Sequence, residues 1–315
     1  MILEGVNGML DPSELFPEVP NIYEFPSVHA GMLYDKERLD KYSAAIRRVV
    51  KEGDIVADIG TGTGLLAFLC LKAGAKRVHA IERSPAIKWA KEIAHKNKFG
   101  NRIVFYEEDS RNCDLGEKVN VVISELIGHI AFEEGMAESL FDAKERFLAA
   151  DGIMIPESVE LKVALVEENE VYPDCVDCWD EIAGIDFSTM RERAIKACYL
   201  TSLGNKNLLS EPKTFFMVDF RESKGLSLQG SHRFDVCRAG KVNGIALWFE
   251  ASLSPNVMLS SGPEKKTHWR QCFAPISIPI TVTDYDKISV DIDMKLRTKE
   301  DDSFEFNFCM EKKTI

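Results

Sequence analysis

The hydrophobic and polar positions of the chain follow one period before Pro156 and another after it. In the first half, Leu39 and Ile46 belong to a helical spacing that predicts an amphipathic helix over 35–50. Strands and helices then alternate four times, with buried-strand patterns at 55–60, 78–82, 103–109 and 119–125, before a last helix at 137–149 and a turn. This alternation of strands and helices predicts a parallel sheet covered on both faces, with ligands at the carboxyl ends of its strands.

After Pro156, strand-like segments with alternating hydrophobicity replace the helices, as in ESVELKVALVEE and KISVDIDMKLR. Many such strands joined by short turns predict an antiparallel barrel or sandwich. One helical interruption, at about 173–197, is expected to project from it. The predicted fold is therefore α/β plus all-β: a flexible lead-in at 1–25, a Rossmann-like domain at 26–155, and a β-barrel domain with a helical arm at 156–315.

The bulk composition fits two globular domains. The 315 residues are too many for one ordinary core, and 45% hydrophobic with 29% charged residues is typical of a folded chain. No apolar run approaches the roughly 20 residues that cross a bilayer. The first residues, MILEGVNGMLDPSELFPEVP, carry acids where a signal peptide carries bases. We therefore expect no membrane partner and a cytoplasmic location, with a nuclear one open to a eukaryotic protein.

Charge and cysteine usage narrow the partners. The formal net charge of −12 argues against direct binding of nucleic acid, because that binding rests on clustered Lys and Arg. The eight cysteines are scattered, and only Cys175 and Cys178 form a CxxC. Since no second CxxC or His pair completes a zinc site, we expect no metal and mostly structural, reduced thiols.

A glycine-rich turn, DIGTGTG, follows the first predicted strand. Glu82 ends the next strand, 24 residues after Asp58, where an acidic side chain can accept hydrogen bonds from both hydroxyls of a ribose. Asp109 and Ser110, at the end of the third strand, are candidates to face an adenine. Absent side chains let the backbone of the turn approach a ligand closely at Gly60, Gly62 and Gly64.

Two cofactors compete for this turn. Nicotinamide dinucleotides favour G-x-G-x-x-G, whereas this chain has G-T-G-T-G with Asp58 two residues upstream. The second form resembles class I methyltransferases. That resemblance implies S-adenosylmethionine as the cofactor and S-adenosylhomocysteine as its product.

The fourth predicted strand runs into SELIGHIAFEEGM. This segment resembles the double-glutamate loop of the protein arginine methyltransferase family, S-E-W-M-G-Y followed by E-S-M, and Glu125 and Glu134 keep its nine-residue spacing. Further matches are MLYDKER with M-L-x-D-x-x-R, THWRQ with T-H-W-x-Q, and WDEIAGIDFSTMRERAIK with the dimerisation arm of the family. The resemblance implies a class I methyltransferase domain, a β-barrel domain with a helical arm, and a homodimer.

The activity that the resemblance implies, methylation of arginine, needs a pair of acids. A guanidinium stays protonated at physiological pH, and its delocalised charge makes each nitrogen a poor nucleophile. Carboxylates of Glu125 and Glu134 on either side of the planar group concentrate positive charge away from one terminal nitrogen and aim its lone pair at the sulfonium methyl. Glu134, rather than the adjacent Glu133, fits the family spacing.

The resemblance also implies roles for residues far apart in the chain. Asp35 and His268 match a family pair that closes the amino-terminal helix over the site and relays the released proton. Arg38 matches the residue that binds the carboxylate of the cofactor. The remaining matches are expected to line the substrate site: Tyr23, Met32, His129, Met136 and Trp269.

This chain departs from the family inside the acid loop, the segment of residues 125–134 that begins and ends with the two candidate acids. Leu126 and Ile127 replace the usual Trp-Met and His129 replaces the Tyr, so the pocket differs and the number of methyl groups added stays open. Arginine in a protein or peptide is the expected substrate, but free L-arginine or another small guanidine fits the same pair of acids. A methyltransferase-like scaffold without activity and a nicotinamide-dependent enzyme are the remaining alternatives.

Overall fold

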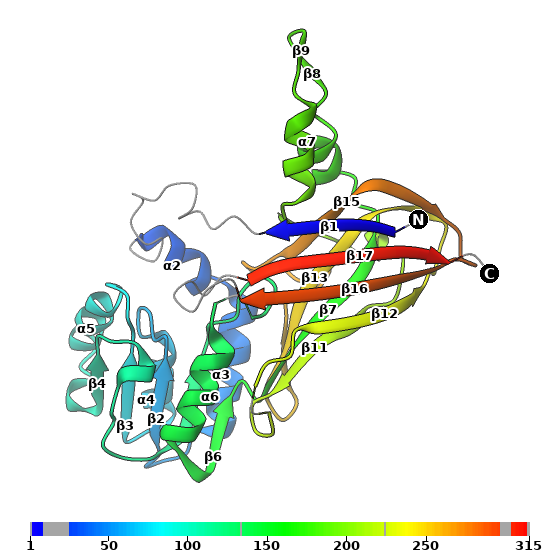
Figure 1. The fold of residues 1–315 in the computed structure, drawn as a ribbon. Helices are drawn as coiled ribbons and strands as arrows, with labels where there is room; N and C mark the ends of the chain where they lie inside the picture. The colour runs from blue at the N-terminus through cyan, green and yellow to red at the C-terminus, as the bar shows by residue number, and fades with distance from the viewer. Residues whose placement is uncertain (1, 9–24, 133, 224, 297–303, 314–315) are drawn as a thin grey trace.

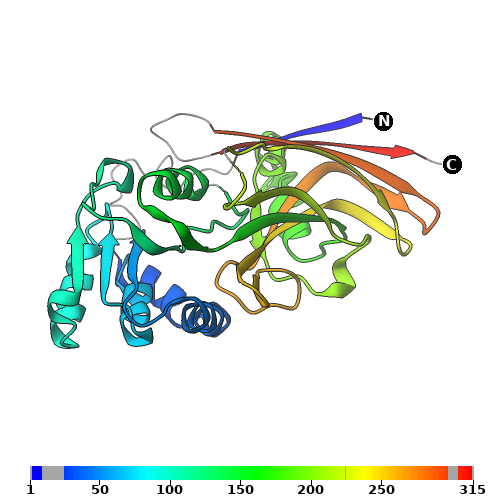
Figure 2. The same ribbon diagram turned by 90° about the horizontal axis from the view of Figure 1, so that it is seen from below.

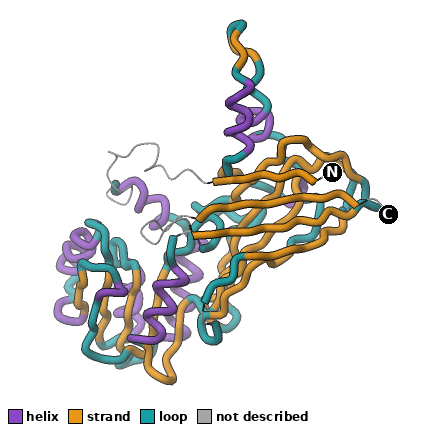
Figure 3. Tube along the Cα trace, in the orientation of Figure 1, coloured by secondary structure: helices purple, strands orange, loops and turns teal. Residues whose placement is uncertain are grey.

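The structure is a computed structural model that describes residues 2–8, 25–132, 134–223, 225–296 and 304–313. Figure 1 shows an α/β unit followed by a larger unit of antiparallel strands, from which an arm projects. Figure 3 shows the same division by secondary structure. Within the described residues, no helix is long and apolar enough to cross a membrane.

Five parallel strands form the α/β unit, in the order β4-β3-β2-β5-β6. They are β2 (Ile55–Ile59), β3 (Arg77–Ile81), β4 (Ile103–Tyr106), β5 (Val119–Ser124) and β6 (Leu148–Ile155). The helices are α2 (Pro26–Leu33), α3 (Lys36–Val49), α4 (Leu65–Ala73), α5 (Ile87–Lys96) and α6 (Met136–Arg146). Figure 2 shows α6 on one face of the sheet and α3 and α4 on the other. Because the strand order reverses beside β2, the carboxyl ends of β2 and β5 flank the crevice where such sheets bind ligands.

The sequence pattern accounts for most of these elements. The central strands β2, β3 and β5 are rich in apolar residues and almost entirely buried. Helix α3 begins where Oδ1 of Asp35 accepts the amide of Arg38, and it buries Tyr42 and Ile46 on one face. The predicted helix over 35–50 and the four predicted strands are confirmed, although β4 ends at Tyr106.

Strand β6 corrects the prediction of a helix end and a turn before Pro156. Residues 148–155 instead pair in parallel with β5 as a fifth strand, with a register shift between Val119 and Val121. Most of β6 is only partly buried or exposed. A partly exposed edge strand lacks the continuous apolar run that is typical of a central strand. The hydrophobic pattern of the sequence therefore does not predict β6.

The second unit consists of two antiparallel sheets that curve into a barrel-like shell (Figure 1). One sheet has the order β10-β15-β13-β7-β11, with β14 paired to β13, and the other has the order β1-β17-β16-β12. The strands after β6 are β7 (Ser158–Val166), β10 (Tyr199–Thr201), β11 (Lys213–Asp219), β12 (Gln229–Asp235), β13 (Gly240–Ser254), β14 (Val257–Ser260), β15 (Gln271–Val282), β16 (Lys287–Leu296) and β17 (Phe304–Lys313). The predicted combination of a parallel α/β unit with an antiparallel unit is confirmed.

Strand β1 (Ile2–Gly8) corrects the prediction of a flexible lead-in over 1–25. It pairs antiparallel with β17, from Ile2 opposite Glu311 to Gly8 opposite Glu305. Strand formation depends on the partner more than on intrinsic preference, and this partner lies at the other end of the sequence. The pairing is therefore invisible to a local pattern.

The arm connects β7 to β10 and points away from the barrel (Figure 1). It comprises a π-helical turn at Tyr172–Val176, a hairpin of β8 (Glu181–Ile182) and β9 (Ile185–Asp186), and α7 (Ser188–Ile195). The helical arm expected at 173–197 therefore ends in a hairpin. Ala183 and Gly184 both have positive φ, as the mirror-image turns that favour hairpins require.

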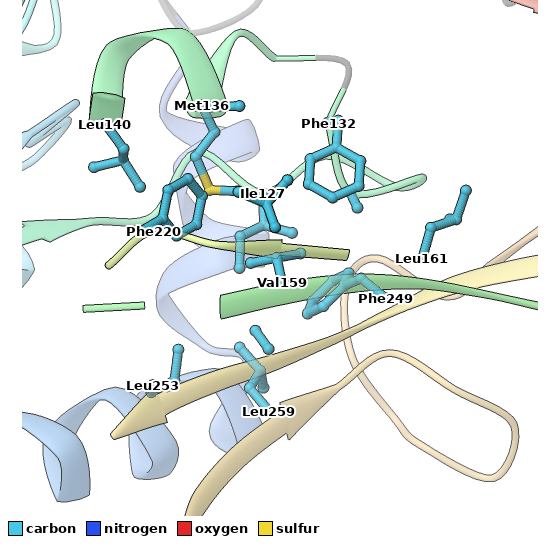
Figure 4. Close-up of a cluster of buried hydrophobic side chains, with 14 of the residues drawn as sticks. Ile127, Phe132, Met136, Leu140, Val159, Leu161, Phe220, Phe249, Leu253 and Leu259 are labelled. Atoms are coloured by element: carbon cyan, nitrogen blue, oxygen red, sulfur yellow. The ribbon is translucent and has the colours of Figure 1, made fainter. Parts of the chain in front are cut away.

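A continuous hydrophobic core joins the two units. At the junction, Met136 and Leu140 of α6 and Ile127 of the acid loop lie close to Val159 and Phe220 (Figure 4). All five side chains are buried. The segment between the two candidate acids is therefore held by the barrel as well as by its own sheet.

Gly244 tests how closely β13 and β15 pack. A methyl group on its Cα would lie 2.4 Å from the carbonyl oxygen of Ala274 and 2.5 Å from the ring of Phe273. Gly244→Ala should lower the free energy of unfolding by about 1–3 kcal/mol, because the sheet must shift. In Gly31→Ala, the matched control, nothing lies within 4 Å of the methyl, and helix α2 should gain about 0.5–1 kcal/mol. Chemical denaturation measures both, and equal effects would contradict the packing argument.

Candidate active site

The glycine-rich turn between β2 and α4 is tied to the neighbouring strand. The amides of Gly60 and Thr61 both donate to the carbonyl of Ile81, at 2.9 and 3.0 Å. Gly60, Gly62 and Gly64 have φ of 72°, 54° and 90°, a region that glycine adopts readily. Because these residues lack side chains, neighbouring groups approach the backbone of the turn closely, as Leu126 does at Gly60 and Phe68 does at Gly64.

Glu82 holds this turn from the end of β3. Its Oε2 accepts the amide of Gly62 at 2.9 Å and its Oε1 accepts the amide of Ser84 at 2.7 Å. Each carboxylate oxygen accepts more than one hydrogen bond, so both keep a lone pair for another donor. This is the arrangement that a ribose with two adjacent hydroxyls requires.

Asp58 is fully buried beneath the turn. Its Oδ2 accepts the hydroxyl of Thr61 at 2.6 Å and the amide of Ala67 at 3.0 Å. Its Oδ1 is buried and has no hydrogen-bond partner among the described residues. Burial raises the pKa of Asp58 to about 7, although the hydrogen bonds from Thr61 and Ala67 act in the opposite direction.

The loop after β4 brings Asp109 and Ser110 to the same edge of the sheet. Both carboxylate oxygens of Asp109 bind Arg111, whose hydrogen bonds lower the pKa of Asp109 to about 2. The guanidinium of Arg146, at the end of α6, donates to the carbonyls of Ser110 and Cys113, both at 2.6 Å. Arg146 is a residue that the sequence analysis missed, and it fastens this loop to the helix that follows the second acid.

These features fit S-adenosylmethionine. The turn offers backbone without side chains, Glu82 offers acceptors to a ribose, and Asp58 contributes a buried oxygen that lacks a partner among the described residues. Helix α2 covers the turn, because a methyl group on Gly62 would lie 3.9 Å from the ring of His29. His29 packs edge-on against Trp89 and was also missed, since its only sequence signal is a histidine within an apolar helix.

Glu125 lies at the end of β5 and binds a guanidinium of the chain itself. Its Oε2 accepts Nε of Arg38 at 2.6 Å and lies 2.6 Å from a second guanidinium nitrogen. Oε1 accepts the amide of Ile127 at 3.2 Å. Both charged side chains are almost entirely buried, so the two residues assigned separately from the sequence form one ion pair.

The acid loop touches the glycine-rich turn. A methyl group on Gly60 would lie 2.6 Å from Cδ2 of Leu126, the residue after Glu125. Tyr42 of α3 donates its hydroxyl to the carbonyl of Ser124, and the hydroxyl of Ser124 donates to the carbonyl of Ile59. The start of the acid loop is thus fixed directly beside the cofactor turn.

Glu134 lies in a turn immediately before Gly135, which precedes α6 with φ of 70°. Its side chain is partly buried. Glu133 lies outside the described residues. The positive end of the α6 dipole stabilises an acid in this position.

Asp35 and His268 meet, although they are far apart in the sequence. Oδ2 of Asp35 accepts both the backbone amide and Nδ1 of His268, each at 2.8 Å. Burial alone would raise the pKa of Asp35, but the hydrogen bonds from His268 and from the amide of Arg38 lower it. The pair joins the start of α3 to the segment before β15.

Trp269 and the acid loop hold each other by reciprocal hydrogen bonds. The indole Nε1 of Trp269 donates to the carbonyl of Ile127 at 2.7 Å, and Nδ1 of His129 donates to the carbonyl of Trp269 at 2.9 Å. Trp269 is almost fully buried and packs edge-on against Phe249. Burial lowers the pKa of His129, whereas its bond to Trp269 raises it.

The other residues expected to line the substrate site differ in their surroundings. Met136 is fully buried beside Phe220, which suits a packing role, and the carbonyl of Met32 accepts a guanidinium nitrogen of Arg38. Tyr23 lies outside the described residues. The substrate roles of these residues and of His129 and Trp269 stay predictions. Within the described residues, no three His, Cys, Asp or Glu side chains are grouped to hold a metal ion.

Two family profiles match overlapping parts of the chain. The arginine methyltransferase oligomerization subdomain matches residues 157–313, and the ribosomal protein L11 methyltransferase matches residues 42–164. Protein arginine N-methyltransferase 6 of Xenopus laevis is 29% identical over 89% of this chain and 87% of its own length. The chain belongs to the protein arginine methyltransferase family. A probable protein arginine N-methyltransferase 6 of Arabidopsis thaliana is also 29% identical, and the match covers 78% of this chain but 58% of that relative.

Solved structures of the family share the fold. The Trypanosoma brucei PRMT1 enzyme-prozyme heterotetrameric complex with AdoHcy matches with a TM-score of 0.86 at 22% identity, over 91% of this chain and 94% of that chain. Arabidopsis thaliana protein arginine methyltransferase 10 matches with a TM-score of 0.79 at 23% identity, over 93% and 94%. The family assigned from the double-glutamate loop is confirmed.

The buried carboxyl of Asp58 predicts a pH-dependent contribution to stability. Its pKa rises from 3.8 to about 7 on folding, so its contribution is complete below pH 3.8 and is lost as the pH rises through 7, a change on the order of 4 kcal/mol. Asp58→Asn lacks this titration. Urea unfolding of both proteins from pH 4 to pH 8 should therefore show the variant gaining stability relative to the parent as the pH rises. A constant difference would contradict the raised pKa.

Proposed function

We propose that this protein transfers a methyl group from S-adenosylmethionine to a guanidino nitrogen of arginine in protein substrates. The observation that carries the proposal is the contact between the acid loop and the cofactor turn, where Gly60 leaves space for Leu126. Glu125 lies directly before Leu126 and already accepts a planar guanidinium, that of Arg38. Donor site and acceptor site therefore adjoin. The names of the relatives support the same activity.

The residues of this chain position the reacting groups. Glu82 and the glycine-rich turn would hold the nucleoside of the cofactor, and Arg38, which orients Glu125 through their ion pair, would bind the cofactor carboxylate. The bound cofactor supplies an electrophilic methyl group on a positively charged sulfur. Helix α2 lies against the turn through His29 and would shield that side of the cofactor from water.

The two acids make one substrate nitrogen nucleophilic. Glu125 and Glu134 bind the guanidinium from two directions, so that positive charge collects away from the attacking nitrogen. With the methyl donor bound, the two acids would aim the lone pair of that nitrogen at the methyl group, in line with its bond to sulfur. The nitrogen loses a proton, and His268, oriented through Nδ1 by Asp35, is placed to pass it to solvent.

Glu134→Gln tests the proposed function. Removing this charge should lower kcat by about 10²–10³-fold, because the substituted amide no longer concentrates charge on the guanidinium. Transfer of a radiolabelled methyl group to a glycine- and arginine-rich peptide measures the activity, with free L-arginine offered in parallel. S-adenosylmethionine binding by calorimetry should be unchanged.

Three results would overturn parts of this proposal. Labelling of free L-arginine alone would assign a small guanidine as the substrate. Calorimetry without S-adenosylmethionine binding would indicate a scaffold. Full activity of Glu134→Gln would contradict the paired-acid mechanism. Met217→Gln, on the exposed surface of the barrel, is the control and should keep the activity of the parent protein.

We further propose that the chain forms a homodimer through its arm. The hairpin tip exposes large apolar side chains: Ile182 is 44% exposed and Ile185 is 60% exposed. Exposed apolar groups on a projecting element are typical of an interaction surface. The match to the oligomerization subdomain supports assembly, and a two-fold arrangement is the commonest form for identical chains.

Charged residues at the arm tip should weaken this dimer. Ile182→Asp combined with Ile185→Asp places carboxylates in the interface and should raise the dimer dissociation constant at least about tenfold. Light scattering over a concentration series measures it. Met217→Asp, with the same 60% exposure as Ile185 but on β11, should leave the dimer unchanged. A parent protein that is monomeric at micromolar concentration would contradict the proposal.

A further inference from the structure

Three cysteines gather at the base of the arm, and the proposed reaction uses none of them. Cys175 lies in the π-helical turn, Cys178 follows three residues later, and Cys198 lies between α7 and β10. All three are free thiols in the structure. Cys175 and Cys178 therefore lie where the chain enters the arm, and Cys198 lies where the chain leaves it.

The three thiols act on one tyrosine, Tyr199, which follows Cys198 directly. Burial raises the pKa of Tyr199 to about 12, and the thiols of Cys175, Cys178 and Cys198 add to that rise. The pKa of Cys175 is raised by burial and then by Cys178. The two sides of the arm also touch at this point, because Arg191 of α7 donates to Asp177, which lies between Cys175 and Cys178.

The geometry of the turn suits a disulfide between the two cysteines of the CxxC. Residues 172–176 form a π-helical turn, Asp177 continues it in the right-handed helical region, and the amide of Asp177 donates to the carbonyl of Tyr172 at 3.1 Å. In a helical turn, residues three apart in the sequence are neighbours on one side. A disulfide needs Cα atoms about 4.4–6.8 Å apart. Bridging Cys175 and Cys178 therefore requires little movement of the backbone.

The two thiols also differ in access. Cys178 is exposed, whereas Cys175 is partly buried. An exposed thiol meets an oxidant first, and a neighbouring thiol then resolves the product. The only other exposed cysteine among the described residues, Cys237, lies outside the arm.

We propose that Cys175 and Cys178 form an oxidisable dithiol, a modification site for peroxides and small disulfides. The thiolate of Cys178 attacks hydrogen peroxide: a sulfur–oxygen bond forms, the oxygen–oxygen bond breaks, and the leaving hydroxide takes a proton to become water. The thiol of Cys175 then displaces the hydroxyl group from that sulfur as a second water, and a disulfide forms. Two thiols lose two electrons in total, and one peroxide is reduced to two waters.

Oxidation at this site reaches the arm through its own contacts. Asp177, between the two cysteines, accepts Arg191 of α7 at 3.0 Å, and the carbonyl of Cys175 accepts Nε1 of Trp179 at 2.8 Å. Arg191 also donates to the carbonyl of Ser277 in β15. A disulfide fixes the turn that holds these bonds. Because the turn lies at the base of a projecting arm, even a small change of angle there displaces the tip and weakens a dimer formed through it. This consequence rests on the proposed dimer.

Titration of the full chain in glutathione redox buffers tests the site. Alkylation followed by peptide mapping should show a peptide containing both Cys175 and Cys178 that has lost two hydrogen atoms. For an internal disulfide, the oxidised fraction follows the ratio of reduced glutathione squared to oxidised glutathione. Cys237, the matched exposed control, should follow the simple ratio of the two, because it forms only a mixed disulfide.

Variants complete the test. Cys178→Ser and Cys175→Ser should each abolish the internal disulfide, whereas Cys237→Ser should retain it. A stable mixed disulfide at Cys178, or a bridge from Cys178 to Cys198 in place of Cys175, would overturn the assignment. Light scattering of the oxidised protein should show an increase of at least about tenfold in the dimer dissociation constant. An unchanged constant would overturn the effect on assembly, while a reduced protein that is already monomeric would overturn the dimer itself and leave the disulfide result standing.

Discussion

The buried ion pair between Arg38 and Glu125 is the interaction on which the rest of the site depends. It joins α3 to the end of β5 in a place where either charge alone would be strongly unfavourable. Removing one partner of such a pair typically costs about 3–5 kcal/mol, because the other charge is left uncompensated. The pair therefore does more than join one helix to one strand. It keeps the buried charge of Glu125 compensated within the chain itself, so the acid stays ionised and oriented beside the glycine-rich turn.

The pattern of the sequence predicts the α/β unit well, because its signals are local. Each of these features is determined by residues close together in the sequence: the buried apolar strands, the helix cap at Asp35 and the glycines of the turn. The acid pair is also visible, since its chemistry fixes both residue type and spacing. Family resemblance adds Asp35 and His268, whose contact no local rule reveals.

The missed features share a physical cause, which is that they depend on partners distant in the sequence. Strand β1 needs β17, and β6 needs β5 beside it. Arg146 fastens the Ser110 loop from a helix end that, in the sequence alone, is an ordinary charged surface. The ion pair of Arg38 with Glu125 was likewise hidden, because each residue already had a role implied separately.

The hydrogen bond from His129 to the carbonyl of Trp269 has a chemical consequence. A carbonyl only accepts, so the ring proton must reside on Nδ1, and the neutral ring that burial favours keeps its lone pair on Nε2. The tautomer is thus set by main chain from the other domain. Nε2 of His129 can therefore only accept a hydrogen bond from a group that reaches it. The hydroxyl of a tyrosine at this position would rotate, and could either donate or accept.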